Sequence, residues 1–369
     1  MPYKISGTKS ETARIIVLKE SDWSIESNTV VSGTGSYEIE DLETGNKLVF
    51  ARNNDGWIEG YGYITSEYYA PLYPPGGDRG VAGGGQVSGT GFLRDLRYIT
   101  ISTGGNAVSF GLLTTPKREM STCSNSGYNR GVFICGYIST FGASEVMEYI
   151  TITSTGNAID FGDSSYKASY MASTSNGPLD RGIHSGGGSQ NYIGYITIST
   201  TGNSLAFGDL TVGRNSHGAC SNNINGRAVF GGGNGPFNVI DYITIATLGD
   251  ATDFGDLTVS RQLTTACSNG TNNRGVWGGG HAYTNTIDYI TIPTTGNAQD
   301  FGDLTVARAM LTSTDNGTND RGVFIAGATS SIISNVIDYI TISSTGVATD
   351  FGDFTTSAGR YNLSATSNA

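Results

Sequence analysis

The side chains best suited to chemistry in this sequence are its four cysteines, because thiolates bind metals and act as nucleophiles. Three of them occupy a position that holds threonine in other copies of the same local pattern: Cys123, Cys220 and Cys267, against Thr174, Thr314 and Thr366. A position that accepts Cys and Thr requires only a small side chain. We therefore expect free structural thiols facing a central channel, and expect the same thiol state for Cys135, which stands where other copies have a glycine pair.

The histidines and the known catalytic motifs give no better case for chemistry. His184, His217 and His281 share no spacing such as His-x-x-x-His, and metal sites need convergent ligands. Residues 313–318 imitate the Asp-box turn of sialidases without its closing Trp, and residues 53–59 imitate part of a calcium loop without its first and last ligands. The sequence predicts no catalytic residue, no metal and no cofactor. Carboxylates paired from different loops, or a cation in an acidic turn, remain alternatives.

These residues belong to a sixfold repeat. The letters Tyr-Ile-Thr-Ile recur at intervals of 46 to 51 residues, at Tyr98, Tyr149, Tyr195, Tyr242, Tyr289 and Tyr339. An Arg-Gly or Arg-Ala pair precedes each tyrosine, and a Phe-Gly pair follows it by twelve residues. One unit, residues 262–308, predicts four strands at 262–269, 275–279, 288–292 and 298–303. Such a unit indicates a solenoid or a propeller blade.

The ends of the repeat predict a closed ring. The first copy, at Arg79, lacks the small-residue strand that should precede it, and the last copy stops just after such a strand, at residues 361–368. We expect this C-terminal segment to pair with residues 79–85 and to complete the first blade, which removes exposed strand edges. The predicted fold is all-β, with a six-bladed β-propeller of four-stranded blades over residues 78–369.

A small β-sandwich is predicted at residues 1–66, followed by a linker at 67–77. Residues 13–18, 37–39 and 47–51 alternate like strands, and Asn54-Asp55-Gly56 favours a hairpin tip. The run Gly-Thr-Gly-Ser-Tyr-Glu-Ile at residues 33–39 resembles carboxypeptidase-regulatory-like domains, which implies an adaptor.

Charge and hydropathy exclude two classes of partner. The formal net charge of −11 would repel phosphate backbones, so we expect no nucleic-acid partner. No segment approaches the roughly 18 apolar residues of a membrane helix, so we expect no membrane insertion. The N-terminus shows no signal-peptide pattern, and we expect synthesis in the cytoplasm of the producing cell.

The connection between the second and third strands of each copy varies most and is the candidate ligand-binding face. Its bulky residues are Phe92, Phe141, Tyr192, Phe237 and Tyr283, and neighbouring loops carry Lys117, Arg214, Arg261 and Arg308. Loops on a rigid scaffold are where binding evolves, and aromatic rings stack on sugars or enter protein pockets. The alternative is that the aromatics fill gaps between blades. We expect the repeated arginines to anchor inter-blade hydrogen bonds and the Phe-Gly-Asp aspartates to cap tight turns.

The order of landmarks, with diglycines such as Gly232-Gly233, resembles kelch-type repeats. The succession of the motifs Tyr-Ile-Thr-Ile, Gly-Asn-Ala and Phe-Gly-Asp-Leu-Thr resembles repeats of virion proteins from tailed bacteriophages, especially marine and cyanobacterial ones. That resemblance implies a non-enzymatic virion protein of a tail fibre, tail tip or capsid decoration. Its N-terminal domain would dock to other virion proteins, and its propeller would contact a host-surface glycan or protein, as a symmetric oligomer. The alternatives are a cellular lectin-like or scaffold propeller and a carbohydrate-active enzyme.

Overall fold

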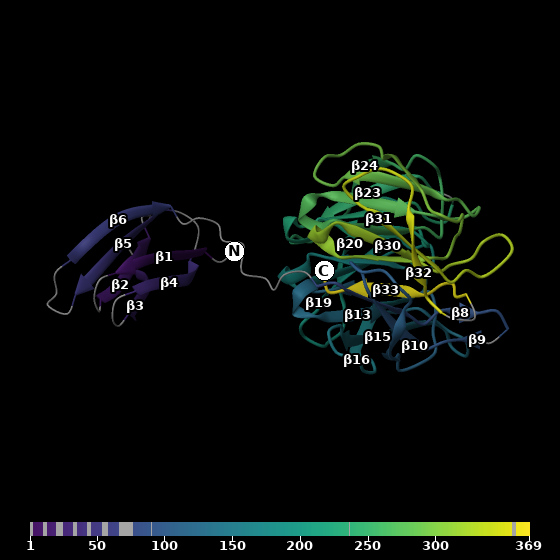
Figure 1. Cartoon of the computed structure of the whole chain (residues 1–369), viewed down its shortest axis with the longest axis horizontal. Coiled ribbons are helices and arrows are strands. Elements are labelled where there is room, and N and C mark those ends of the chain that lie inside the picture. The colour runs from purple at the N-terminus through teal and green to yellow at the C-terminus, as the bar shows by residue number, and fades with distance from the viewer. Residues whose placement is uncertain are drawn as a thin grey trace. The chain divides into compact units, whose positions relative to one another are not determined.

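The computed structural model divides the chain into two compact units, Met1–Tyr73 and Pro74–Ala369 (Figure 1). Residues 77–89, 91–235, 237–355 and 359–369 are described in full, and before them only the course of six strands. The predicted linker therefore lies outside the described residues, apart from Gly77.

The N-terminal unit contains two antiparallel sheets. One pairs β1 (Tyr3–Lys9) with β4 (Gly35–Leu42). The other has the order β3-β2-β5-β6, from β2 (Ala13–Lys19), β3 (Ile25–Val31), β5 (Asn46–Asn53) and β6 (Ile58–Thr65). The three strands predicted here fall within β2, β4 and β5. The predicted hairpin is confirmed by the pairing of β5 with β6 on either side of residues 54–57, which themselves lie outside the described residues.

The second unit is a six-bladed β-propeller of antiparallel blades. The first blade combines β7 (Arg79–Gly83), β10 (Asp95–Thr100) and β11 (Val108–Leu112) with the C-terminal β33 (Ser364–Ser367). The second has β12 (Ser121–Ser124), β13 (Arg130–Ile134), β15 (Gly142–Thr151) and β16 (Ile159–Ala168), and the third β17 (Ala172–Ser175), β18 (Arg181–Ser185), β19 (Tyr192–Thr197) and β20 (Leu205–Asp209).

The last three blades repeat the same plan. They are β21 (Gly218–Ser221), β22 (Arg227–Gly231), β23 (Val239–Thr244) and β24 (Thr252–Asp256); β25 (Thr265–Ser268), β26 (Arg274–Gly278), β27 (Thr286–Thr291) and β28 (Gln299–Asp303); and β29 (Thr312–Asp315), β30 (Arg321–Ile325), β31 (Val336–Thr341) and β32 (Thr349–Asp353). Short strands in the loops are β8 (Gln86–Val87), β9 (Gly91–Phe92) and β14 (Tyr137–Ile138). The first and second strands of blades two to six are joined by one-turn 3₁₀ helices, η1 (Ser126–Tyr128), η2 (Gly177–Leu179), η3 (Asn223–Asn225), η4 (Gly270–Asn272) and η5 (Gly317–Asn319).

The predicted closure of the ring is confirmed. β33 pairs with β7 in the register Ser364 to Gly83 through Ser367 to Gly80, and Tyr361 forms a further bridge to Gln86. The innermost strand of each blade touches that of the next, and β33 touches both β29 and β12. The N- and C-terminal ends of the propeller therefore meet in one blade.

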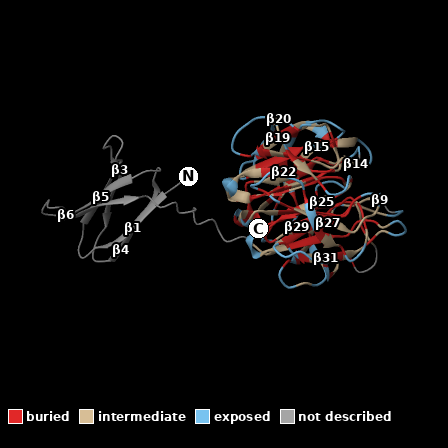
Figure 2. Ribbon diagram, turned by 90° about the horizontal axis from the view of Figure 1, so that it is seen from above, coloured by how far each residue is buried: buried red, intermediate tan, exposed pale blue. Residues whose placement is uncertain are grey.

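Hydrophobic residues lie between neighbouring blades, because each blade buries the apolar face of the next. One such cluster joins Val276 and Phe301 of the fifth blade to Phe324 and Ile342 of the sixth. Within every blade the repeated tyrosine meets the Phe-Gly phenylalanine edge to face, with ring centroids 6.0 to 6.4 Å apart. In Figure 2 the buried strands fill the interior, and exposed residues lie on the connecting loops and on the outermost strands.

The repeated arginines clamp each blade to the next, as predicted. In the fifth blade the Arg274 guanidinium lies 4.4 Å over the Tyr289 ring and donates to the carbonyl of Ser343 in the sixth blade at 2.8 Å. The six equivalents are Arg79, Arg130, Arg181, Arg227, Arg274 and Arg321, and each donates to a carbonyl of the following blade. The cation–π contact and the hydrogen bond together fix the orientation of neighbouring blades.

The Phe-Gly-Asp motifs are not turns, and our prediction that their aspartates cap turns is wrong. Each of the five motifs lies in the outermost strand of its blade, as does the Phe110-Gly111 pair of the first copy. In all six the Phe carbonyl accepts a backbone hydrogen bond from a glycine turn of the next blade, as from Gly156 to Phe110 at 3.0 Å. A Cβ on Gly111 would collide with the Gly156 carbonyl. Glycine is required here because the next blade approaches too closely for a side chain.

Candidate functional site

The two ends of the propeller differ in what they carry. At one end, which we call the turn face, lie the 3₁₀ helices and the turns between third and fourth strands. At the other, the loop face, lie the connections between second and third strands and those that lead into each innermost strand. The antiparallel pairing of the strands fixes this arrangement. Ser121, the first residue of β12, pairs with Ile134, the last residue of β13, so the connection into β12 and the connection out of β13 lie at the same end. The candidate ligand-binding residues all belong to loop-face connections.

The four predicted cations lie inside the propeller and not on its surface. Their side chains are fully buried, each in an ion pair: Lys117 with Glu148, Arg214 with Asp241, Arg261 with Asp288 and Arg308 with Asp338. The three Arg–Asp distances are 2.7 Å. The arginines also donate to backbone carbonyls, as Arg214 does to Phe230 at 3.2 Å and Val239 at 3.1 Å. These four pairs, the loop braces, hold the connection into the innermost strand of the second, fourth, fifth and sixth blades against the same blade.

Burial governs the electrostatics of the loop braces. It lowers the pKa of Arg214 and raises the pKa of Asp241, while the attraction between the two charges opposes both shifts. The Asp241 carboxylate also accepts from the Thr211 hydroxyl at 2.5 Å, so its lone pairs are satisfied. A buried pair with this many partners orients its loop, because removal of either charge leaves the other unpaired.

The third blade has no loop brace. Ala168 and Gly194 stand where the four braced blades hold the cation and the acid, and His184 fills the space. His184 is fully buried, its ring nitrogens have no hydrogen-bond partner, and burial lowers its pKa to about 4. It is therefore a neutral packing residue at pH 7.

The predicted aromatic residues lie on the loop face with unequal exposure. Phe141 is 77% exposed, whereas Phe92, Tyr192, Phe237 and Tyr283 are half-buried. Three of the half-buried ones contact another side chain. Phe92 packs edge to face on Tyr137, with Arg118 4.7 Å over its ring, the Tyr192 hydroxyl bonds Ser165 at 2.5 Å, and the Tyr283 ring lies 6.0 Å from that of His281. Phe141 is the most exposed of the five.

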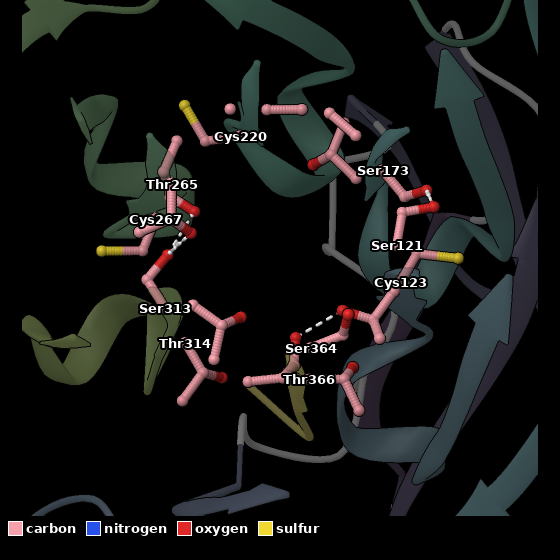
Figure 3. Close-up of a pocket in the computed structure, with 18 of the residues that line it drawn as sticks. Ser121, Cys123, Ser173, Cys220, Thr265, Cys267, Ser313, Thr314, Ser364 and Thr366 are labelled. Carbon is pink, nitrogen blue, oxygen red and sulfur yellow. Dashed lines mark hydrogen bonds between the residues drawn. The ribbon is translucent and has the colours of Figure 1, made fainter. Parts of the chain in front are cut away.

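The innermost strands enclose a central channel with a cavity of about 220 Å³ (Figure 3). Hydroxyls line it, and some bond across blades, as Thr265 does to Ser313 at 2.7 Å. The sulfurs of Cys123, Cys220 and Cys267 point away from the channel in Figure 3, which corrects our expectation that they face it. Each sulfur lies against the glycine of the next blade's Arg-Gly pair, at Gly182, Gly275 and Gly322.

The cysteines are free, as predicted, and all four are buried. Burial raises the pKa of Cys123 to about 12 and that of Cys135 to about 11. Both thiols are thus protonated at pH 7 and poorly nucleophilic.

The loop-face end of the channel is ringed by six residues that the sequence analysis missed. They are Glu119, Tyr170, Ser216, Leu263, Met310 and Asn362, one from each blade, and we call them the mouth ring. The backbone N–H of each donates to the carbonyl of the preceding member at 2.8 to 3.1 Å, and Glu119 donates to Asn362, so the six hydrogen bonds form a closed circle.

The backbone conformation of the mouth ring is left-handed at every member, with φ between 54° and 61°. The chain has 54 glycines, and at another left-handed position, the first residue of the diglycine, it uses glycine in four blades of six. Yet no mouth-ring member is glycine, although a non-glycine residue costs about 1 kcal/mol there. The six side chains are also all different. Comparing the six copies two residues before each innermost strand would have revealed this position.

Glu119 is the charged member of the mouth ring. Its side chain is almost fully buried and bonded from three directions, by Arg118 at 2.7 Å, by Asn362 at 3.3 Å and by the Tyr170 hydroxyl. Burial raises the pKa of Glu119, and its partners oppose that shift. The side of the ring around Glu119 is polar, while Leu263 and Met310 make the opposite side apolar.

The other end of the channel carries one carboxylate, Asp315, where the other blades have serine. It accepts from the backbone N–H groups of Ser268 at 3.2 Å and Gly317 at 3.0 Å. Burial raises its pKa to about 6. Beyond it, Asn223 reaches toward Ser126 at 3.5 Å and narrows the opening at the turn face.

Among the described residues no three His, Cys, Asp or Glu side chains are grouped to hold a metal ion, and no described helix could span a membrane. The chain matches no known family model and no curated protein.

Proposed function

We propose that this chain is a non-enzymatic binding protein of a phage virion, in which the N-terminal unit docks to other virion proteins and the loop face of the propeller contacts the host surface. The virion part of the proposal rests on the resemblance of the repeats to those of tailed-phage virion proteins, in a tail fibre, tail tip or capsid decoration. The blades also resemble kelch repeats, because they carry a diglycine with left-handed backbone such as Gly279-Gly280.

One observation carries the binding role: the sequence varies on the loop face while the remaining contacts repeat. The arginine clamps recur in all six blades and the loop braces in four. Between these fixed supports lie Phe141, exposed on the loop face, and the six different residues of the mouth ring. A rigid frame with variable loops suits recognition.

Two other functions are carried as alternatives. A cellular lectin-like or scaffold propeller would use the same loop face without a particle. A carbohydrate-active enzyme would need paired carboxylates on one rim. The described channel lining has Glu119 at one end and Asp315 at the other, and Glu119 is already bonded by Arg118, Tyr170 and Asn362, which favours binding over hydrolysis.

Immunogold electron microscopy with antibodies against the propeller tests the virion role. We expect labelling at symmetric positions on phage particles from a lysate of the producing culture. Recovery of the chain only as a soluble cellular protein would contradict the proposal.

Matched variants test the loop face on the same particles. Phe141→Ala removes an exposed aromatic ring from the loop face, and Tyr128→Ala removes one that is 53% exposed on the turn face. We expect the first to reduce adsorption to host cells and the second to leave it unchanged. Equal adsorption of both variants would assign binding elsewhere.

A further inference from the structure

We infer that the mouth ring is a ligand site that takes one neutral pyranose sugar, seated with its hydroxyls toward Tyr170 and Asn362 and its apolar face toward Leu263 and Met310. This inference rests on the proposed binding role of the propeller and names the ligand class and the residues that would read it.

The first argument is the cost of the mouth-ring side chains. The closed circle of backbone hydrogen bonds imposes a left-handed φ on six residues, and glycine would relieve the strain without disturbing the circle. Six different side chains are kept there instead. Four of them, Tyr170, Ser216, Leu263 and Met310, are half-exposed at the opening. The contacts that these side chains make at the channel opening must therefore offset the cost of the left-handed backbone.

The second argument is size. Pockets for drug-sized ligands have volumes of about 300–1,000 Å³. The channel cavity, at about 220 Å³, is smaller and fits a single compact ring. A polymer could enter only through its terminal residue.

The third argument is charge. The described lining contains the carboxylates Glu119 and Asp315 and no lysine or arginine, so an anionic ligand is disfavoured. A cationic ligand would need a free carboxylate. Glu119 is already bonded by Arg118, Tyr170 and Asn362, and Asp315 lies at the far end. A neutral ligand fits both facts.

The fourth argument is hydrogen-bond type. Behind the mouth ring the channel is lined by hydroxyls such as Ser121, Thr265 and Ser364, which both donate and accept. Ligand hydroxyls also do both, so they can join such a lining without leaving a buried group unpaired. The apolar side at Leu263 and Met310 would cover the C–H face of the ring.

Saturation-transfer NMR and calorimetry on the full chain test the site, with D-glucose, D-galactose, D-mannose and N-acetyl-D-glucosamine as probes. We expect at least one to bind. Asn362→Gly keeps the left-handed backbone and removes the amide, and Asn223→Gly makes the same change at the turn-face end, where φ is 55°. We expect the first to weaken binding about tenfold or more, the loss of one or two hydrogen bonds, and the second to leave it unchanged.

A second variant keeps the test independent of Glu119. Leu263→Asn, tolerated at left-handed φ, should also weaken binding by covering the sugar with a polar group. Failure of all four sugars to bind, or equal binding by all variants, overturns the inference. If Phe141→Ala reduces host adsorption while Asn362→Gly and Leu263→Asn bind the sugar as the wild type does, the sugar site is overturned and the proposed binding role stands. Sugar binding by a chain that labels no particle would instead contradict the virion role.

Discussion

The backbone N–H of Arg79 donates to the side-chain oxygen of Asn368 at 3.0 Å, across 289 positions of sequence. The same bond recurs inside every other blade between residues five apart, as from Arg130 to Asn125 at 2.8 Å. The Asn368 amide also donates to Asn129 of the second blade at 2.9 Å. The blade completed by both ends of the chain therefore has the same bonds as the blades formed from one continuous segment.

Removal of residues 361–369 should destabilise the whole propeller. It strips β33 from β7, exposes an unpaired strand edge and opens the mouth ring at Asn362. We expect a lower and broader thermal transition, followed by the fluorescence of the fully buried Trp277. A synthetic peptide of residues 359–369 added to the truncated chain should restore the transition, and a scrambled peptide should not. An unchanged melting curve after truncation would contradict this role.

Removing one charge of a loop brace should lower the free energy of unfolding more than replacing both charges with apolar side chains. Asp288→Ala leaves the buried Arg261 guanidinium unpaired, and we expect a loss of about 3–5 kcal/mol of unfolding free energy. The double variant Arg261→Met with Asp288→Leu should lose less, because no charge stays buried. Urea unfolding of the two variants and the wild type gives the comparison. A double variant less stable than Asp288→Ala would refute this account.

Asp315 should make stability depend on pH. Its pKa rises from 3.8 in the unfolded chain to about 6 in the folded one, so the folded state binds its proton more tightly. The unfolding free energy should therefore fall as pH rises from about 4 to 6, by on the order of 2 kcal/mol, and stay low above pH 6. Asp315→Ser, the residue of the other blades, should stabilise the protein at pH 8 and have little effect at pH 4. A gain of equal size at both values would rule out the carboxyl as the cause.

Two glycines that meet across a blade interface should respond differently to alanine. A Cβ on Gly111 would collide with the Gly156 carbonyl, whereas a Cβ on Gly156 would meet nothing within 4 Å. We expect Gly111→Ala to cost about 1–3 kcal/mol, as overpacking does, and Gly156→Ala to change stability by less than about 0.5 kcal/mol. Chemical denaturation measures both. Similar losses would show that the interface adapts to a side chain.

The propeller could be predicted from the sequence because its strands, clamps and closure repeat in register. The period, the missing strand before Arg79 and the spare strand after residue 360 depend only on comparing copies. The loop braces were missed because Arg261 and Asp288 lie 27 residues apart, and an arginine in a loop is usually exposed. The Phe-Gly-Asp motif was mistaken for a turn, since the neighbour that requires its glycine belongs to the next blade.

The mouth ring was missed for a different reason. Left-handed backbone is usually recognised by glycine or asparagine, and Leu263 or Met310 gives no such signal. Its geometry comes from the hydrogen-bond circle, which exists only once all six blades have assembled.

The Gly77 N–H donates to the Asn368 carbonyl at 2.5 Å, so the two ends of the propeller touch. The packing of the blades therefore does not require the chain to begin at the blade where it now begins. A circular permutant, with residues 77 and 369 joined and new termini cut in a 3₁₀ turn, would keep every clamp and the whole mouth ring. In such a molecule the N-terminal unit could be joined to the turn face of a different blade.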